Sequence, residues 1–283
     1  MMNSISNPSF HANHNPAKLR SPSNVRLRGI ALPNEHGSWG ILFEPMVAAI
    51  AVAYSPAAIW VALLFIGAFL LRQPLRIWLA DHKAGRDLPQ TAAARKYAFI
   101  YFAIFATGLS GTLAFGTLSA LVPLLIVAPL GAVQIYYDVN GKSRALLPEL
   151  TGVVALSSSA AVVALAGGWT IPGAAALWGI FVLRLIPSIL YIRNRLRLEK
   201  KKPFSLTVPL VTHAIAVLAV ASLVFSGLCP RLTLAMFVVL LGRAAIGLSP
   251  FRKSRKAMQV GIFEVIFGVL TVLSVIVGYH LNL

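Results

Sequence analysis

Long apolar runs alternate with short polar segments along most of the chain. Each run has about the 20 residues that a helix needs to cross ~30 Å of hydrocarbon. Internal prolines such as Pro74 and Pro187 are tolerated in membrane helices and kink them. The pattern predicts an all-α, polytopic membrane bundle of about nine transmembrane helices, at residues 39–55, 57–80, 96–115, 118–137, 146–167, 171–192, 205–227, 231–249 and 258–280.

Composition supports placing most of the chain in lipid. Charged residues make up only 12% of the sequence, against about 25% in a soluble domain. A formal net charge of +17 would suggest nucleic-acid binding in a soluble protein. Here the cations flank apolar runs in short loops, a pattern that sets membrane orientation, so we expect no nucleic-acid partner. The single cysteine, Cys229, excludes an internal disulfide and a cysteine-based metal site.

The first 30 residues are polar and basic, and no apolar stretch follows the cations closely enough for a cleaved signal peptide. We predict a disordered cytoplasmic tail at 1–30 and a transmembrane domain at 31–283. Of the 25 lysines and arginines, all but Arg231 lie in the tail or near the connections that follow even-numbered spans. This asymmetry predicts a cytoplasmic N-terminus and an external C-terminus.

Ionisable residues inside spans usually face a bundle interior or a wet cavity. All eight acids fall in or near the predicted cytoplasmic half. The deepest charged or titratable residues are expected to meet in a cavity that opens to the cytoplasm; they are Glu44, Arg184, His213, Arg243 and Glu264. For His213 alone, a hydrogen-bonded structural role is favoured over a role as ligand or base.

One stripe of residues in the sixth predicted span suits an anion. Arg184, Ser188, Tyr191 and Arg195 are spaced four, three and four apart and so share a helix face. Their guanidinium and hydroxyl groups could bind a phosphate or carboxylate. The basic residues of 193–202 have a simpler explanation, as topology anchors that reach lipid headgroups, and for them we favour it.

Two other connections carry candidate chemistry. After the second span, Arg72 and Arg76 share a face, and Asp81 follows; an anion site and a helix end with interfacial cations are equally good explanations. After the fourth span, a turn at residues 138–141 precedes further charged residues, Lys142, Arg144 and Glu149. Glu149 lies just inside a span, where Arg144 or an arginine of the second connection is its expected partner.

The start of the first span contains Glu35, His36 and Glu44 around Trp39. Glu35 and His36 either anchor the first turn of the helix or line a site at its mouth. Glu44 lies deeper and needs a cationic partner, for which we predict Arg72 or Arg76. The sequence has no HExxH, GxSxG, Walker or CxxC pattern, so common hydrolase, nucleotide and zinc functions have no support.

Three segments, PNEHGSWGILFEP, DHKAGR and YYDVNGKSRALLPE, resemble the YwiC-like family of bacterial membrane proteins, whose members lack an established activity. The likeness covers most of the chain after the tail. More distantly, the layout is similar to the UbiA superfamily of intramembrane prenyltransferases. That resemblance implies nine helices around a cavity with a polar cytoplasmic mouth, and it makes Tyr137, Lys142 and Arg144 a loose counterpart of a Tyr, Lys and Arg set in those enzymes.

UbiA-type enzymes bind Mg²⁺-diphosphate through two Asp-rich motifs, and this chain departs from both. Arg72, Arg76 and a single Asp81 stand at the first, and Arg184, Tyr191, Arg193 and Arg195 stand at the second. Arginines would repel Mg²⁺ but could hold a phosphate directly. Mg²⁺ is therefore disfavoured, and no metal site or cofactor is expected.

We therefore expect a protein of the bacterial cytoplasmic (inner) membrane that binds, or as a diverged prenyltransferase transfers, an isoprenoid phosphate or similar anionic lipid. Glu44, Asp81 and Asp138 are the candidate catalytic residues. A transporter or lipid flippase and a noncatalytic scaffold are the alternatives. Few ionisable residues in the external half argue against transport, and the deep charges argue against a scaffold.

Overall fold

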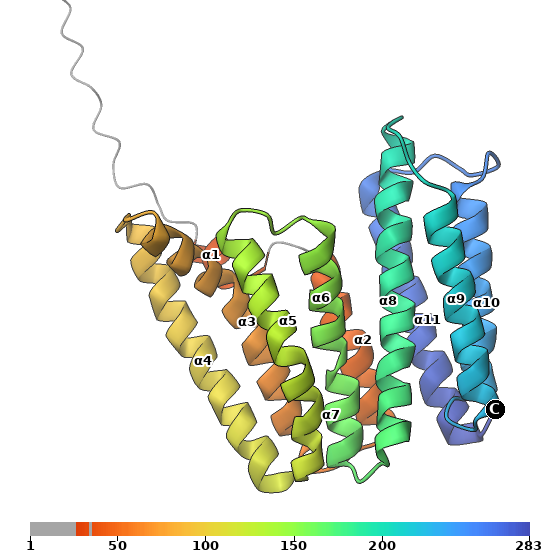
Figure 1. Ribbon diagram of the computed structural model, residues 1–283, viewed down its shortest axis with the longest axis horizontal. Helices are drawn as coiled ribbons and strands as arrows, with labels where there is room; N and C mark the ends of the chain where they lie inside the picture. The colour runs from red at the N-terminus through yellow and green to blue at the C-terminus, as the bar shows by residue number, and fades with distance from the viewer. Residues whose placement is uncertain (1–26, 34–35) are drawn as a thin grey trace, which may run out of the picture.

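The computed structural model describes residues 27–33 and 36–283, which form helices and connections without a β-strand (Figure 1). The elements are α1 (Leu27–Ala31), α2 (His36–Val52), α3 (Ala58–Lys83), α4 (Pro89–Phe115), the 3-10 helix η1 (Leu118–Leu121), α5 (Val122–Val139), α6 (Leu146–Ser157), α7 (Ser159–Ala166), α8 (Ile171–Glu199), α9 (Thr207–Phe225), α10 (Arg231–Leu248) and α11 (Ala257–Leu281).

The helices match the nine predicted runs, which confirms the all-α polytopic class. Within the described residues, eight helical segments are long and apolar enough to cross a membrane, with η1–α5 and α6–α7 each counting as one. The first predicted span corresponds to α2, which has only 17 residues and measures about 25 Å. Thus α2 is somewhat short for the ~30 Å of hydrocarbon, and its charged residue Glu44 lies near its middle.

The predicted tail extends too far toward the first span. Residues 27–31, assigned to the tail, form the short helix α1, which packs against α3 and α4. Ile30 is buried there, and the Gln73 side chain donates a hydrogen bond to the carbonyl oxygen of Gly29 over 3.0 Å. The apolar residues of this segment give it a surface to bury. Residues 1–26 of the predicted tail lie outside the described part of the chain.

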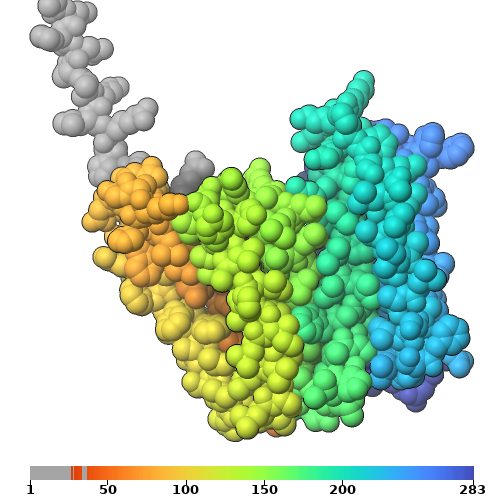
Figure 2. Space-filling model, viewed as in Figure 1, coloured from red at the N-terminus to blue at the C-terminus, as the bar shows by residue number. Residues whose placement is uncertain are grey.

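The helices lie side by side, and four connections lie at the same end of the bundle as α1, at the top of Figure 1. We call this the polar end and define it by connections 84–88, 140–145, 200–206 and 249–256. The C-terminus lies at the opposite end. These are the connections that the distribution of lysine and arginine predicted to share one side. Figure 2 shows the end of α8 and the connection after it (teal) projecting beyond α6 at this end.

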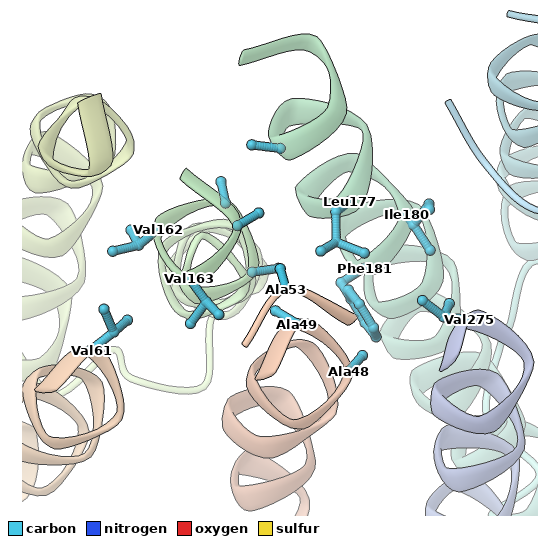
Figure 3. Close-up of a cluster of buried hydrophobic side chains, with 14 of the residues drawn as sticks. Ala48, Ala49, Ala53, Val61, Val162, Val163, Leu177, Ile180, Phe181 and Val275 are labelled. Atoms are coloured by element: carbon cyan, nitrogen blue, oxygen red, sulfur yellow. The ribbon is translucent and has the colours of Figure 1, made fainter. Parts of the chain in front are cut away.

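Small residues bring α2 into the middle of the core. Ala48 and Ala49 of α2 and Ala53 just after it are buried, and Figure 3 shows them between α7 and α8. Leu177 and Phe181 of α8 belong to the same apolar cluster. Because alanine side chains are short, the backbone of α2 comes close to its neighbours, as is typical of membrane helix contacts. This position allows Glu44, one turn before Ala48, to reach the interior.

Glycine has the same effect between α3 and α4. A Cβ atom added at Gly108 would overlap backbone atoms of Leu64, and one added at Gly67 would overlap backbone atoms of Phe105. Gly111 likewise accommodates the ring of Trp60. The two helices therefore pack at a separation that only glycine permits.

We predict that Gly108→Ala lowers the free energy of unfolding by about 1–3 kcal/mol, because the overlapping atoms are backbone and the helices must separate. Gly131→Ala in α5 is the matched control, since no atom lies within 4 Å of its added Cβ. Thermal unfolding of both variants in detergent measures the difference. Equal midpoints for the two would contradict the close α3–α4 packing.

Candidate functional site

The five residues predicted to lie deepest meet inside the bundle. Glu44 comes from α2, Arg184 from α8, His213 from α9, Arg243 from α10 and Glu264 from α11. We call these five residues the buried charge cluster. The Arg184 side chain is only 2% exposed and lies between two carboxylates: its Nε atom is 3.8 Å from Glu44 Oε2, and its Nη1 atom is 3.7 Å from Glu264 Oε2. The five residues therefore lie together as expected, and two of them, Arg243 and Glu264, also line a cavity. A cytoplasmic opening of that cavity stays a prediction.

Arg243 is the second cation of the cluster. Its Nη1 atom donates to Glu264 Oε1, and its guanidinium lies over the Tyr191 ring, 4.4 Å from the ring centre. Its Nη2 atom lies 3.4 Å from Ser188 Oγ, which also accepts a hydrogen bond from Arg184 Nη1. Two arginines and two glutamates are therefore joined through shared partners, and their formal charges cancel.

His213 is held in a neutral form by its two ring contacts. Its Nδ1 atom is 2.7 Å from the carbonyl oxygen of Pro209, so Nδ1–H donates. Its Nε2 atom is 3.3 Å from Arg243 Nη2, which can only donate, so Nε2 accepts. This arrangement agrees with the hydrogen-bonded structural role that the sequence favoured for His213.

Glycines make room for Glu44 between α2 and α11. A Cβ atom added at Gly268 would overlap Glu44 Oε1, and one at Gly40 would lie 3.5 Å from the same atom. The Glu44 carboxylate therefore rests directly against the backbone of α11, one turn after Glu264. A larger residue at 268 would push the carboxylate out of the cluster.

A cavity of about 420 Å³ adjoins the cluster toward the polar end, between α8, α10, α11 and connection 249–256. This volume is typical of small-molecule sites. Its lining carries five cations and one acid: Arg195, Arg243, Arg252, Lys253, Arg255 and Glu264. Four aromatic rings complete much of the wall: Tyr191, Phe251, Phe263 and Phe267. We call this space the cationic cavity.

Protein groups hold several of these cations in position. Arg195 is buried, donates to the carbonyl oxygens of Gly247 and Lys253, and pairs with Glu199 over 2.7 Å. The Arg255 guanidinium stacks on Phe263, 3.8 Å from the ring centre. Preorganised guanidinium groups lose less conformational entropy when they bind an anion.

The predicted anion-binding residues divide into three groups. Tyr191 and Arg195 line the cationic cavity, whereas Arg184 and Ser188 of the same buried stripe lie deeper, in contact with the cluster. The remaining candidates belong to α3, α5 and connection 140–145, which do not line this cavity; they are Arg72, Arg76, Tyr137, Lys142 and Arg144. Arg195 is thus the predicted cation that both the stripe and the cavity include.

Two predicted ion pairs were wrong. Glu44 contacts Arg184 rather than Arg72 or Arg76, because α2 turns this residue toward α8 and α11. Arg72 instead pairs with Asp138 of α5 over 2.7 Å. Glu149 pairs with Arg193 of α8, not with Arg144, whose carbonyl oxygen accepts from the same guanidinium.

Asp81 fastens the connection between α3 and α4. Its Oδ2 atom accepts from Thr91 Oγ1 over 2.7 Å and from the Gln90 side chain over 3.3 Å. A smaller cavity of about 290 Å³ lies beside it, lined by Trp78, His82, Gly85, Arg86, Asp87, Thr91 and Arg95. Glu35 and the side chain of His36 lie outside the described part of the structure.

Sequence reasoning missed most of the cavity wall. The run FRKSRK at 251–256 served only to orient the chain, although it supplies three of the lining cations. Phe263 and Phe267 were not considered at all, yet both line the cavity. Their spacing of four residues places them on one helix face after the basic run, and this signal was available.

The fold and site define an integral membrane protein with a polytopic helical bundle, a buried charge cluster and a cationic cavity at the polar end. Residues 32–164 match the model of the family described as YwiC-like protein. Neither the curated proteins nor the solved structures gave a match. The matched segment runs from the connection before α2 into α7, so it includes Glu44 but no residue that lines the cationic cavity.

Groups of three or more His, Cys, Asp or Glu side chains placed to share a metal ion do not occur among residues 27–33 and 36–283.

We predict that Arg184→Gln lowers the free energy of unfolding by about 3–5 kcal/mol, because it leaves Glu44 and Glu264 buried without their shared cation. Arg193→Gln is the control: it breaks a half-exposed pair with Glu149 and should cost about 1 kcal/mol or less. Denaturant unfolding in detergent measures both. A loss for Arg184→Gln no greater than that of the control would contradict the role of Arg184.

Proposed function

We propose that this membrane protein binds an isoprenoid phosphate, diphosphate or similar anionic lipid in the cationic cavity. The observation that carries the proposal is the composition of the wall, where five cations and a single acid adjoin four aromatic rings. Such a surface matches a ligand with an anionic head and an apolar chain. Charge alone would suit a soluble anion, and aromatic residues alone would suit any hydrocarbon.

The head group would bind near connection 249–256. Arg252, Lys253 and Arg255 belong to that connection, and Arg195 approaches from α8. Guanidinium groups bind phosphate oxygens in pairs, and such charge-assisted hydrogen bonds are among the strongest in proteins. The cations already positioned by Gly247, Phe263 and Glu199 would change little on binding.

The apolar chain would leave along α11. Phe263 and Phe267 line the cavity on this helix, and Ile262 and Ile266 beside them are exposed on the outer surface of the bundle. In a membrane, that surface faces lipid tails. A polyprenyl or acyl chain could thus remain in lipid while its head group enters the protein.

The proposed orientation puts the polar end in the cytoplasm of a bacterial cell, at the inner membrane. It rests on the concentration of lysine and arginine in the connections at this end. The C-terminus, at the opposite end, would then be external.

Binding is proposed here ahead of prenyl transfer. Of the candidate catalytic carboxylates, Asp81 accepts hydrogen bonds from Thr91 and Gln90, and Asp138 pairs with Arg72. Glu44 lies in the buried charge cluster, and none of the three lines the cationic cavity. A UbiA-like transfer reaction would therefore need another acid or base, and Glu264 is the acid that the cavity wall provides.

We predict that the double variant Lys253→Ala, Arg255→Ala binds geranylgeranyl diphosphate at least about tenfold more weakly than the unchanged protein, because two charge-assisted contacts are lost. Native mass spectrometry of detergent-purified protein, titrated with this lipid, measures the affinity. The control is Lys200→Ala, Lys202→Ala, which removes the same charge from exposed positions of connection 200–206.

Two outcomes would overturn this proposal. One is an equal loss of affinity in Lys200→Ala, Lys202→Ala, which would mean that binding depends only on the net charge of the protein. The other is equally tight binding of geranylgeraniol, which lacks the phosphates. Retention of bulk phospholipid alone would instead support a noncatalytic scaffold.

A transporter or lipid flippase is the second candidate. The observation that favours it is the buried charge cluster, because charged groups shared by four or more membrane helices are typical of proteins that move ions or polar substrates. Movement of a fluorescent isoprenoid phosphate across proteoliposomes, dependent on the protein, would favour transport over binding alone.

A further inference from the structure

Glu44 is the less firmly held of the two acids in the buried charge cluster. Glu264 accepts a direct hydrogen bond from Arg243 at Oε1, although its Oε2 atom has no hydrogen-bond partner among the described residues. No such bond to either oxygen of Glu44 occurs among the described residues. Glu44 Oε2 has no hydrogen-bond partner among the described residues, and its 3.8 Å separation from Arg184 Nε exceeds hydrogen-bonding distance. A carboxylate inside a membrane bundle with an unused oxygen is suited to carry a proton.

The surrounding charges come from three helices. Arg184 of α8 contacts Glu44 directly, Glu264 of α11 contacts Arg184, and Arg243 of α10 contacts Glu264. Helices α3, α6 and α7 also pack against α2, but within the described residues they form no salt bridge with Glu44. His213 contributes no charge in its hydrogen-bonded tautomer. The cluster is therefore neutral only when both glutamates are ionised.

We infer that Glu44 is a proton-binding site and that its protonation strengthens anion binding in the cationic cavity. The second part of this inference rests on the function proposed above. The step is the addition of one proton to the Glu44 carboxylate to give the neutral acid, with no other bond made or broken. The cluster then carries one net positive charge.

That charge reaches the cavity through shared partners. Once Glu44 is neutral, Glu264 is the one anion among the described residues that still pairs with Arg184 and Arg243. Arg243 and Glu264 both line the cavity. Because Glu264 then balances the charge of two arginines, less of the positive charge of Arg243 is cancelled, and the electrostatic potential at the cavity wall becomes more positive. Coupling of this kind is reciprocal, so a bound anion would in turn favour proton uptake by Glu44.

The proton site is tested without any ligand. Infrared difference spectroscopy during an acid titration detects the carbonyl stretch of a carboxylic acid. We expect a band from a buried acid that disappears in Glu44→Gln and persists in Asp87→Asn, which alters an exposed acid of connection 84–88. Gly268→Ala, whose added Cβ would displace the Glu44 carboxylate, should shift the same band while keeping the acid.

The coupling is tested with geranylgeranyl diphosphate on the same proteins. Glutamine mimics the neutral acid, so Glu44→Gln should hold the high-affinity state throughout. The unchanged protein and Asp87→Asn should match Glu44→Gln in acid and bind about tenfold more weakly once Glu44 is ionised. The diphosphate itself gains and loses protons over this pH range, which also changes its affinity. Comparing the affinity of each protein with that of Glu44→Gln at the same pH removes this contribution.

The outcomes separate the two proposals. The proton site is overturned if no band is lost in Glu44→Gln and the spectrum of Gly268→Ala matches that of the unchanged protein. This holds whether or not the lipid binds. The band without any diphosphate binding supports the proton site and overturns the proposed function. The band together with identical pH dependence in Glu44→Gln and unchanged protein overturns the coupling alone.

Discussion

The placement of Arg184 between Glu44 and Glu264 is the interaction on which the architecture of this bundle depends. An unpaired charge in a membrane interior is costly, so each of these residues requires the others to be in place. Glu44, Arg184 and Glu264 belong to α2, α8 and α11, and Arg243, which pairs with Glu264, belongs to α10. The cluster thus fixes how helices from the two ends of the sequence are rotated against one another, which apolar packing alone specifies weakly in lipid.

The cationic cavity is built on that arrangement. Arg243 and Glu264 belong to both the cluster and the cavity wall, so the positions of α10 and α11 serve both. Tyr191 joins them, since its ring lies under Arg243 and also faces the cavity. Any change in the charge of the cluster is therefore expected to change the electrostatic potential in the cavity. The proposed lipid site and the proposed proton site follow from this shared wall.

The sequence predicted much of the fold but fewer of the contacts. Apolar runs of membrane length and the side preference of lysine and arginine predicted the spans and the common polar end. The deep positions of Glu44 and Arg184 predicted that charges would meet. Their pairing did not follow, because periodicity gives the face of a helix but not the neighbour that this face meets. Arg72 was the nearer candidate in sequence, yet it turns to Asp138 on α5.

The cavity was missed for a related reason. Residues 251–256 looked like an ordinary basic connection, and only the packing of α8, α10 and α11 shows that they close over a space lined with phenylalanine. The short α2 was also not evident, since its apolar run continues past the helix to residue 55. Tertiary packing, which no local pattern encodes, determines both features.

The central claim is that Glu44 and Arg184 interact inside the bundle, and a double-mutant cycle measures this directly. Unfolding free energies in detergent are needed for Glu44→Gln, Arg184→Gln, the double variant and the unchanged protein. The account predicts that the double variant is less destabilised than the sum of the two single variants, with an interaction energy of about 1–3 kcal/mol. Additive effects, with an interaction energy near zero, would contradict it.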